Sequence, residues 1–178
     1  MRRFAAVVAL SVVVAFVVAG CGASAEEKWA GSVCSDVADW KSQVQKASDD
    51  VSSQLQSPQA GTLAAINADV RSAVSATEQL ATNLKATKPP DTEAGKQAKQ
   101  EINALSAQMA TTVAKAKQTV SSVPQGASLT ETARALAPLA SSLSSLAIAA
   151  SSTLASVKST ASEIKKGFEN AGSCKQFQ

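Results

Sequence analysis

Apolar residues recur at alternating intervals of three and four along most of this chain, and this spacing limits what the chain can fold into. The stretch 63–84 follows the pattern throughout, with Leu63, Ile66, Val70, Ala73, Thr77, Leu80 and Leu84. A helix with 3.6 residues per turn places such positions on one face. Similar stripes cover 33–55, 98–123 and 136–168, and no stretch alternates apolar and polar residues for long, as a strand would. The chain is therefore expected to be all-α.

Three short segments rich in proline or glycine separate the four stripes, at 57–61, 89–91 and 124–126. Helices end at such segments, because proline lacks an amide hydrogen and glycine favours turns. Short connections make consecutive helices antiparallel neighbours. We therefore predict an antiparallel up-down-up-down four-helix bundle over residues 26–178. The proline-marked turns argue against the alternative, an extended coiled coil.

The last stripe is interrupted by a proline and is preceded by further helical sequence. Pro138 would clash with the carbonyl group of Arg134 inside a helix, so we expect a kink or a break there. Ser128 and Glu131 have the spacing of a capping box, which makes 129–137 helical. This segment is expected either to fold across the ends of the first two helices as a cap or to project as a binding tip.

The composition excludes several classes of function. The chain contains no histidine, which removes the commonest general base and the commonest metal ligand. Its net charge of +3 falls to +1 without Arg2 and Arg3, too little for phosphate binding. Asp36 and Asp39 share a helical face without any pattern that suggests a buried acid. We expect no catalytic residue, no cofactor, no metal and no nucleic-acid partner.

The first 20 residues are typical of a secretory signal peptide. Arg2 and Arg3 precede an apolar run at 5–18, and small residues follow. This run is shorter than the roughly 20 residues that cross a bilayer. A permanent transmembrane helix is therefore not expected.

Val18-Ala19-Gly20-Cys21 resembles the lipobox of bacterial lipoproteins, in which an apolar residue and two small residues precede an invariant cysteine. The resemblance implies that residues 1–20 are removed and that Cys21 carries a diacylglyceryl group. Residues 21–25 would then form a short tether, and the protein would lie on the extracytoplasmic face of the cell membrane. Two acyl chains give a stable anchor. An ordinary secretory signal that is cleaved near a cysteine is the alternative.

With Cys21 acylated, Cys34 and Cys174 are the two cysteines that remain. We expect them to form a disulfide in an oxidising compartment, with two free thiols as the alternative. An antiparallel register set by this bridge places Trp40 opposite Phe168. The bridge would also bring together the aromatic residues of the mature chain, which are Trp29, Trp40, Phe168 and Phe177. They would form either an apolar patch or pocket, or a plug that closes the base of the bundle.

In composition, the rest of the chain resembles the small Ala/Ser/Thr-rich exported lipoproteins of high-GC Gram-positive bacteria. Two functional hypotheses follow. The protein is an interaction or scaffold module that contacts envelope proteins or cell-wall polymers, or it is a carrier or sensor of a small apolar ligand held between its helices. The small residues of the stripes favour a solid bundle, and therefore the scaffold hypothesis.

Overall fold

The structure is a computed structural model that describes residues 22–124 and 126–177. All regular structure in these ranges is helical, which confirms the all-α prediction. The elements are α1 (Ala25–Gln56), α2 (Thr62–Ala86), α3 (Glu93–Ser122), α4 (Leu129–Ser159), α5 (Ser162–Asn170) and the 3-10 helix η1 (Gly172–Phe177).

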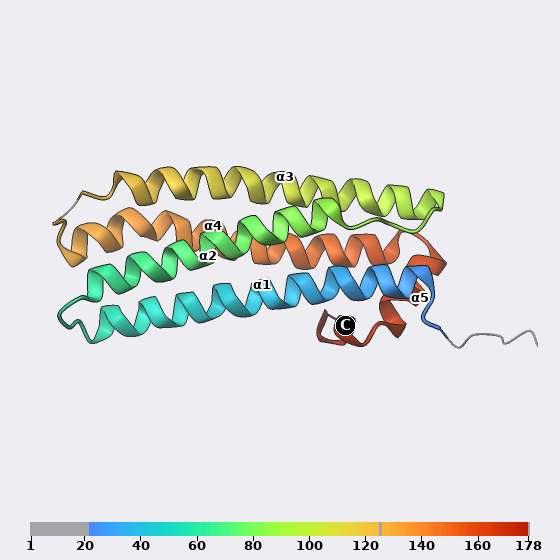
Figure 1. Cartoon of the computed structure of the whole chain (residues 1–178), viewed down its shortest axis with the longest axis horizontal. Helices are drawn as coiled ribbons and strands as arrows, with labels where there is room; N and C mark the ends of the chain where they lie inside the picture. The colour runs from blue at the N-terminus through green and yellow to red at the C-terminus, as the bar shows by residue number, and fades with distance from the viewer. Residues whose placement is uncertain (1–21, 125, 178) are drawn as a thin grey trace, which may run out of the picture.

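The four long helices lie side by side and alternate in direction along the chain (Figure 1). Each of α1, α2 and α3 packs along the helix that follows it. After α4, the chain turns back, and α5 and η1 pack against the first half of α1 (Figure 1). The described part of the chain therefore has six helical elements, whereas the sequence stripes predicted four.

The fourth predicted helix is divided in two. α4 stops at Ser159, and Ala161 is extended, with φ −158° and ψ 159°, before α5 begins at Ser162. The apolar stripe nevertheless continues across this break, because Val157, Ile164 and Phe168 are buried in one core. Apolar spacing indicates which residues are buried and does not reveal a turn between two helices that share a core.

This turn also changes the predicted register. Phe168 does not lie opposite Trp40 but packs edge-on against Trp29, with ring centroids 5.9 Å apart. Trp29 precedes Trp40 by eleven residues, which is about 16 Å along a helix. The register prediction assumed one continuous helix from α4 to the disulfide, and that assumption is wrong.

Pro138 lies inside α4, which runs without interruption from Leu129 to Ser159. The predicted break is therefore absent, and 129–137 is neither a separate cap nor a separate tip. Pro138 is solvent-exposed, so water can bond to the carbonyl group of Arg134 that the missing amide leaves free. The predicted capping box is confirmed, since Ser128 and Glu131 exchange hydrogen bonds at the start of α4.

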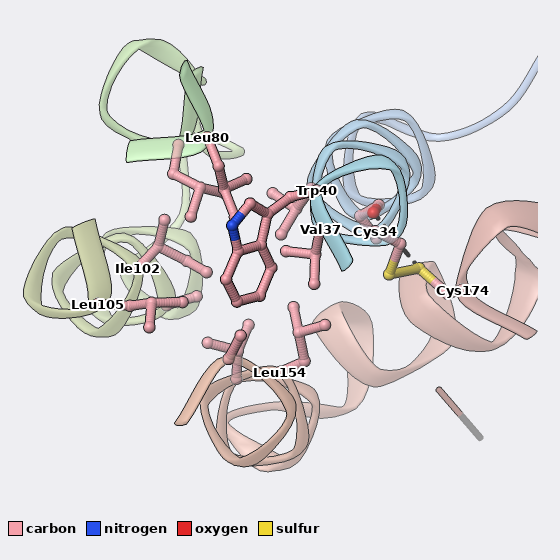
Figure 2. Packing of buried hydrophobic residues seen from close by; sticks show 14 of the residues in the cluster. Cys34, Val37, Trp40, Leu80, Ile102, Leu105, Leu154 and Cys174 are labelled. Atoms are coloured by element: carbon pink, nitrogen blue, oxygen red, sulfur yellow. Dashed lines mark hydrogen bonds between the residues drawn. A yellow bond between two sulfur atoms is a disulfide. The ribbon is translucent and has the colours of Figure 1, made fainter. Parts of the chain in front are cut away.

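The core has two parts. The larger one surrounds Trp40, which points between the four long helices toward Leu80, Ile102, Leu105 and Leu154 (Figure 2). The smaller part lies at the opposite end of the helices; its buried members are Ile66, Val74, Val113, Ala116, Leu136 and Leu139. Below, the end that contains Cys34 and Cys174 is called the disulfide end, and the other is called the far end.

Candidate functional site

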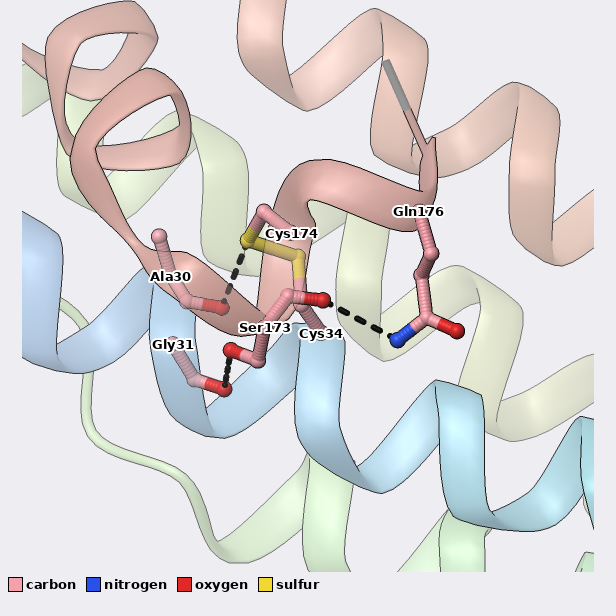
Figure 3. The surroundings of a disulfide bond; sticks show 6 residues. All are labelled: Ala30, Gly31, Cys34, Ser173, Cys174 and Gln176. Atoms are coloured by element: carbon pink, nitrogen blue, oxygen red, sulfur yellow. Dashed lines mark hydrogen bonds between the residues drawn. A yellow bond between two sulfur atoms is a disulfide. The ribbon is translucent and has the colours of Figure 1, made fainter.

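A disulfide joins the start of α1 to η1. The sulfur atoms of Cys34 and Cys174 are 2.08 Å apart, and both side chains are buried. Beside the bridge, the Ser173 hydroxyl donates a hydrogen bond of 2.8 Å to the carbonyl oxygen of Gly31 (Figure 3). The structure thus pairs the two cysteines that the sequence predicted as partners.

α5 approaches the backbone of α1 closely at one glycine. A Cβ atom at Gly167 would lie 2.7 Å from the carbonyl carbon of Glu26, which is too close for any side chain. Glycine at this position therefore lets α5 fill the space between α1 and α4 at the disulfide end.

The aromatic residues proposed as an apolar patch belong to the core. Trp29, Trp40 and Phe168 are 4%, 2% and 3% exposed, and the half-buried Phe177 packs against the same cluster. Trp40 is further fixed by its indole Nε1, which donates a hydrogen bond of 3.0 Å to the Thr77 hydroxyl. These side chains do not form an exposed patch. The interpretation as a plug fits the burial of Trp29, Phe168 and Phe177, whereas Trp40 also lines the groove described next.

An apolar groove opens between α1 and α4 in the half of the molecule toward the far end. These two helices contact each other less extensively than the other neighbouring long helices do, and a cleft of about 530 Å³ lies between them. α2 contributes the third side of the cleft. The apolar lining consists of Trp40, Val44, Ala47, Val51 and Leu55 of α1, Ile66, Val70 and Ala73 of α2, and Ala133, Leu136, Ala137, Leu139, Ala140, Leu143 and Ala147 of α4.

Two features of the sequence cause the groove. α5 has nine residues, so it fills the space between α1 and α4 only near the disulfide. Beyond α5, the α4 positions that face this space include small residues, among them Ala133, Ala137 and Ala140. Small side chains cannot bridge the distance to α1, and the space is left open.

The polar lining of the groove is concentrated on one edge. It comprises Lys41, Gln45, Ser48, Asp49 and Ser52 of α1 and Ser144 of α4, all of them exposed. On the other edge, α4 carries no charged residue between Arg134 and Lys158. A ligand in the groove would therefore meet an apolar interior and a single polar rim.

α4 is the one helix in the described ranges that is long and apolar enough to cross a membrane, judged by length and composition alone. Its leucines Leu136, Leu139, Leu146 and Leu154 are instead buried against the other helices. Only 22% of its most apolar window is buried, however. Its exposed positions include serines as well as Ala137 and Ala140, which line the groove.

Asp36 lies on α1 outside the groove. Partial burial raises the pKa of its carboxyl group, the hydrogen bond of 3.2 Å from the Asn83 amide opposes that rise, and the nearby Asp39 carboxylate adds to it. The sequence offered no reason to expect a shifted pKa here. The Asp36 side chain joins α1 to α2 through Asn83, and this role is structural.

No protein-family model matches the chain, and no curated protein and no solved structure matches it. The groove and the sequence motifs are therefore the features that indicate a function. The groove was missed from the sequence, although the uncharged run 135–157 with its many alanines was the signal that could have indicated it. Cys21 and the signal segment 1–20 lie outside the described residues, and α1 begins at Ala25, within the predicted tether.

Proposed function

We propose that this protein is a lipid-anchored carrier that holds an apolar ligand in the groove between α1 and α4. The observation that carries this proposal is the cleft of about 530 Å³, because small-molecule sites are typically clefts of about 300–1,000 Å³ with a mainly apolar lining. The small residues of the stripes, taken alone, favour a solid scaffold. The open seam between α1 and α4 reverses that preference.

The exposure of apolar side chains supports a binding role. Leu55, at one end of the groove, is 40% exposed, and Ala137 and Ala140 are exposed on the opposite wall. A contiguous apolar surface in contact with water is unfavourable and usually indicates a partner or ligand. A ligand would remove this surface from water.

The location follows from the N-terminal sequence. The apolar run 5–18 and the motif that ends in Cys21 support a diacylglyceryl anchor on the extracytoplasmic face of the cell membrane. In this proposal α1–α4 form an antiparallel four-helix bundle, to which α5 and η1 are added as a clasp at the disulfide end. Replacing Cys21 with serine in a bacterial host should release the protein from the membrane fraction, and unchanged fractionation would refute the anchor.

The carrier and scaffold functions differ in whether a small molecule is bound. Protein purified from its own host is compared by native mass spectrometry with and without organic extraction. We expect an extractable ligand on the wild-type protein and its loss from Ala140→Trp, which fills the groove. Ala155→Trp is the matched control, because Ala155 is an exposed alanine of α4 outside the groove lining.

If wild type, Ala140→Trp and Ala155→Trp all have the mass of the bare polypeptide with its anchor, the carrier function is refuted. The scaffold function would then be preferred, with envelope proteins or cell-wall polymers as partners. A ligand retained equally by both variants would place binding outside the groove.

A further inference from the structure

The dimensions of the groove define the shape of its ligand. Its lining runs from Trp40 to Leu55 on α1 and from Ala133 to Ala147 on α4. At 1.5 Å per residue, each wall is about 21–22 Å long. A cleft of about 530 Å³ with this length has a mean cross-section of about 24 Å². The groove is therefore long and narrow.

A single unbranched hydrocarbon chain has the same proportions. A methylene group fills about the same volume as a water molecule in the liquid, roughly 30 Å³. An extended chain of tetrahedral bonds advances about 1.2 Å per bond, as an extended protein backbone does. The volume of the groove corresponds to about 18 methylene groups, and its length corresponds to about 18 bonds. A second chain beside the first, or a fused ring system, would extend beyond this cross-section into solvent.

The charges on the rim indicate where the polar end of such a ligand lies. Lys41 and Asp49 are the two charged residues of the lining, and both are exposed. Lys41 lies at the end nearest the disulfide, and Asp49 lies two helical turns further along α1. Among the described residues, Lys41 is not part of an ion pair. An anionic head group beside Lys41 would complement this charge.

The opposite end of the groove suits the end of an apolar chain. A chain that starts beside Lys41 passes Val44 and Val51 and reaches Leu55 after about 21 Å. Leu55 is the most exposed large apolar residue of the lining. Its coverage by the ligand removes that surface from water.

We infer that the groove binds a long-chain fatty carboxylate of about 16–18 carbons, with the carboxylate beside Lys41 and the methyl end at Leu55. This inference rests on the proposed carrier function and names the ligand class for the same groove.

The chain length is tested by calorimetric titration of the full mature protein with straight-chain carboxylates of about 8 to 22 carbons. Each methylene that enters the groove should strengthen binding about fourfold, and the gain should stop at about 16–18 carbons. Ala140→Trp should weaken binding of hexadecanoate at least tenfold, whereas Ala155→Trp should not change it. A gain that stops near 10 carbons, or tighter binding of a diacyl lipid or a sterol, would overturn the inference.

The head group is tested with hexadecanoate and its uncharged analogue hexadecanol. Lys41→Gln should weaken hexadecanoate binding about twofold to fivefold, the range of an exposed ion pair, and leave hexadecanol binding unchanged. Lys115→Gln removes an exposed charge from α3, outside the groove, and should affect neither ligand. Equal binding of hexadecanoate to wild type and Lys41→Gln would refute the assignment of the carboxylate to Lys41.

The results separate this inference from the proposed function. A host ligand that Ala140→Trp displaces but that is not a single-chain carboxylate overturns the inference and leaves the carrier function standing. A lysophospholipid as that ligand keeps the single chain and corrects the head group. If no host ligand and no alkyl probe responds to Ala140→Trp, both the inference and the carrier function fail.

Discussion

At the scale of single residues, Trp40 depends on one polar partner in an otherwise apolar core. Its indole N–H reaches the hydroxyl of Thr77, and that hydroxyl donates in turn to the carbonyl oxygen of Ala73 at 2.8 Å. Trp40 and Thr77 are both nearly inaccessible to water. Without this acceptor, the indole N–H has no hydrogen-bond partner in the core.

Thr77→Val keeps the shape of the side chain and removes the acceptor. We expect the free energy of unfolding to fall by about 1–3 kcal/mol, because the Trp40 N–H stays buried without a partner. Urea denaturation followed by tryptophan fluorescence measures the change. Thr82→Val, on the exposed side of α2, is the control and should change stability far less; equal effects of the two substitutions would contradict the role of this hydrogen bond.

Asp36 makes stability depend on pH. Burial raises the pKa of Asp36 in the folded protein above the ordinary value of 3.8. As the pH falls from 7 through this raised pKa, the folded state takes up a proton before the unfolded chain does, so the contribution of Asp36 to stability increases. The contribution becomes constant below pH 3.8.

Asp36→Asn should remove this dependence, because asparagine does not titrate and its side-chain oxygen can still accept from Asn83. Asp36 is partly exposed, so the effect is small. At pH 7 we expect the variant to be at least as stable as wild type, and at pH 3.5 to lose that advantage. Urea unfolding at the two pH values measures the difference in stability between the variant and wild type. If Asp36→Asn destabilises the protein more at pH 7 than at pH 3.5, the predicted direction of the pH dependence is wrong.

At the scale of elements, α4 is unusual because it contains a proline, Pro138, in its first third. Pro138 leaves the carbonyl group of Arg134 without its donor, and proline inside a helix costs about 3 kcal/mol or more in an unadapted site. Pro138→Ala restores the donor, while the more flexible unfolded chain opposes the gain by about 0.4–1 kcal/mol.

We therefore expect Pro138→Ala to raise the thermal midpoint of unfolding, with a net gain of up to about 2–2.6 kcal/mol. Differential scanning calorimetry measures this change. A lower midpoint would mean that the neighbours of α4 are packed around a bend that Pro138 produces.

The same helix marks the limit of prediction from apolar spacing. The stripe correctly assigned Leu136, Leu154, Ile164 and Phe168 to the core. It could not place the turn at Thr160–Ala161, because residues on both sides of that turn are buried in the same cluster. α5 is therefore seen only in the structure. The same holds for the groove between α1 and α4, which lies where α5 no longer fills the space between them.

At the scale of the whole molecule, the disulfide closes a loop with a sequence separation of 140 residues. Closing a loop of this length stabilises the fold by up to roughly 5 kcal/mol through the lost entropy of the unfolded chain. It also attaches η1 to α1, since both cysteines lie in that contact. The bridge therefore connects the last described element to the first.

The double substitution Cys34→Ser with Cys174→Ser should lower the free energy of unfolding by about 2–5 kcal/mol. Hydrogen exchange should show η1 and α5 losing protection before α2 and α3, because the bridge attaches η1 directly to α1. The control is reductant, which should destabilise wild type and leave the double variant unchanged. Equal stability of wild type and double variant would show that packing of η1 alone is sufficient.

The sequence could predict the four long helices, the three turns between them and the cysteine pair, because each depends on local spacing or on a count. The groove depends on the distance between α1 and α4, which are far apart in the chain. Small residues such as Ala137 and Ala140 suit a tightly packed seam as well as an open one. The position of α5 decides between a packed and an open seam. The apolar spacing did not distinguish α5 from the rest of the fourth stripe.

The proposed anchor would be joined to the start of α1 through residues 22–24. The distance from the start of α1 to the groove decides whether the protein could bind its own acyl chain. The groove begins at Trp40, about 22 Å along α1 from Ala25, and ends at Leu55, about 45 Å from it. A chain of 16 carbons spans about 19 Å. An acyl chain on Cys21 would have to leave the bilayer to approach the groove, at a cost of about 0.8 kcal/mol for each methylene withdrawn.

We therefore expect the anchor to stay in the membrane and the groove to stay open to a free ligand. Cys21→Ser protein, purified without an anchor, should bind hexadecanoate with the same Kd as lipidated protein held in a bilayer nanodisc, when both values refer to the free aqueous hexadecanoate left after partition into the bilayer. Calorimetric titration of the two forms, with Ala140→Trp as the filled-groove control for each, measures this. If the lipidated form fails to bind while Cys21→Ser binds, the acyl chain of the protein itself occupies the groove, because a free ligand can then enter only after the anchor has been removed.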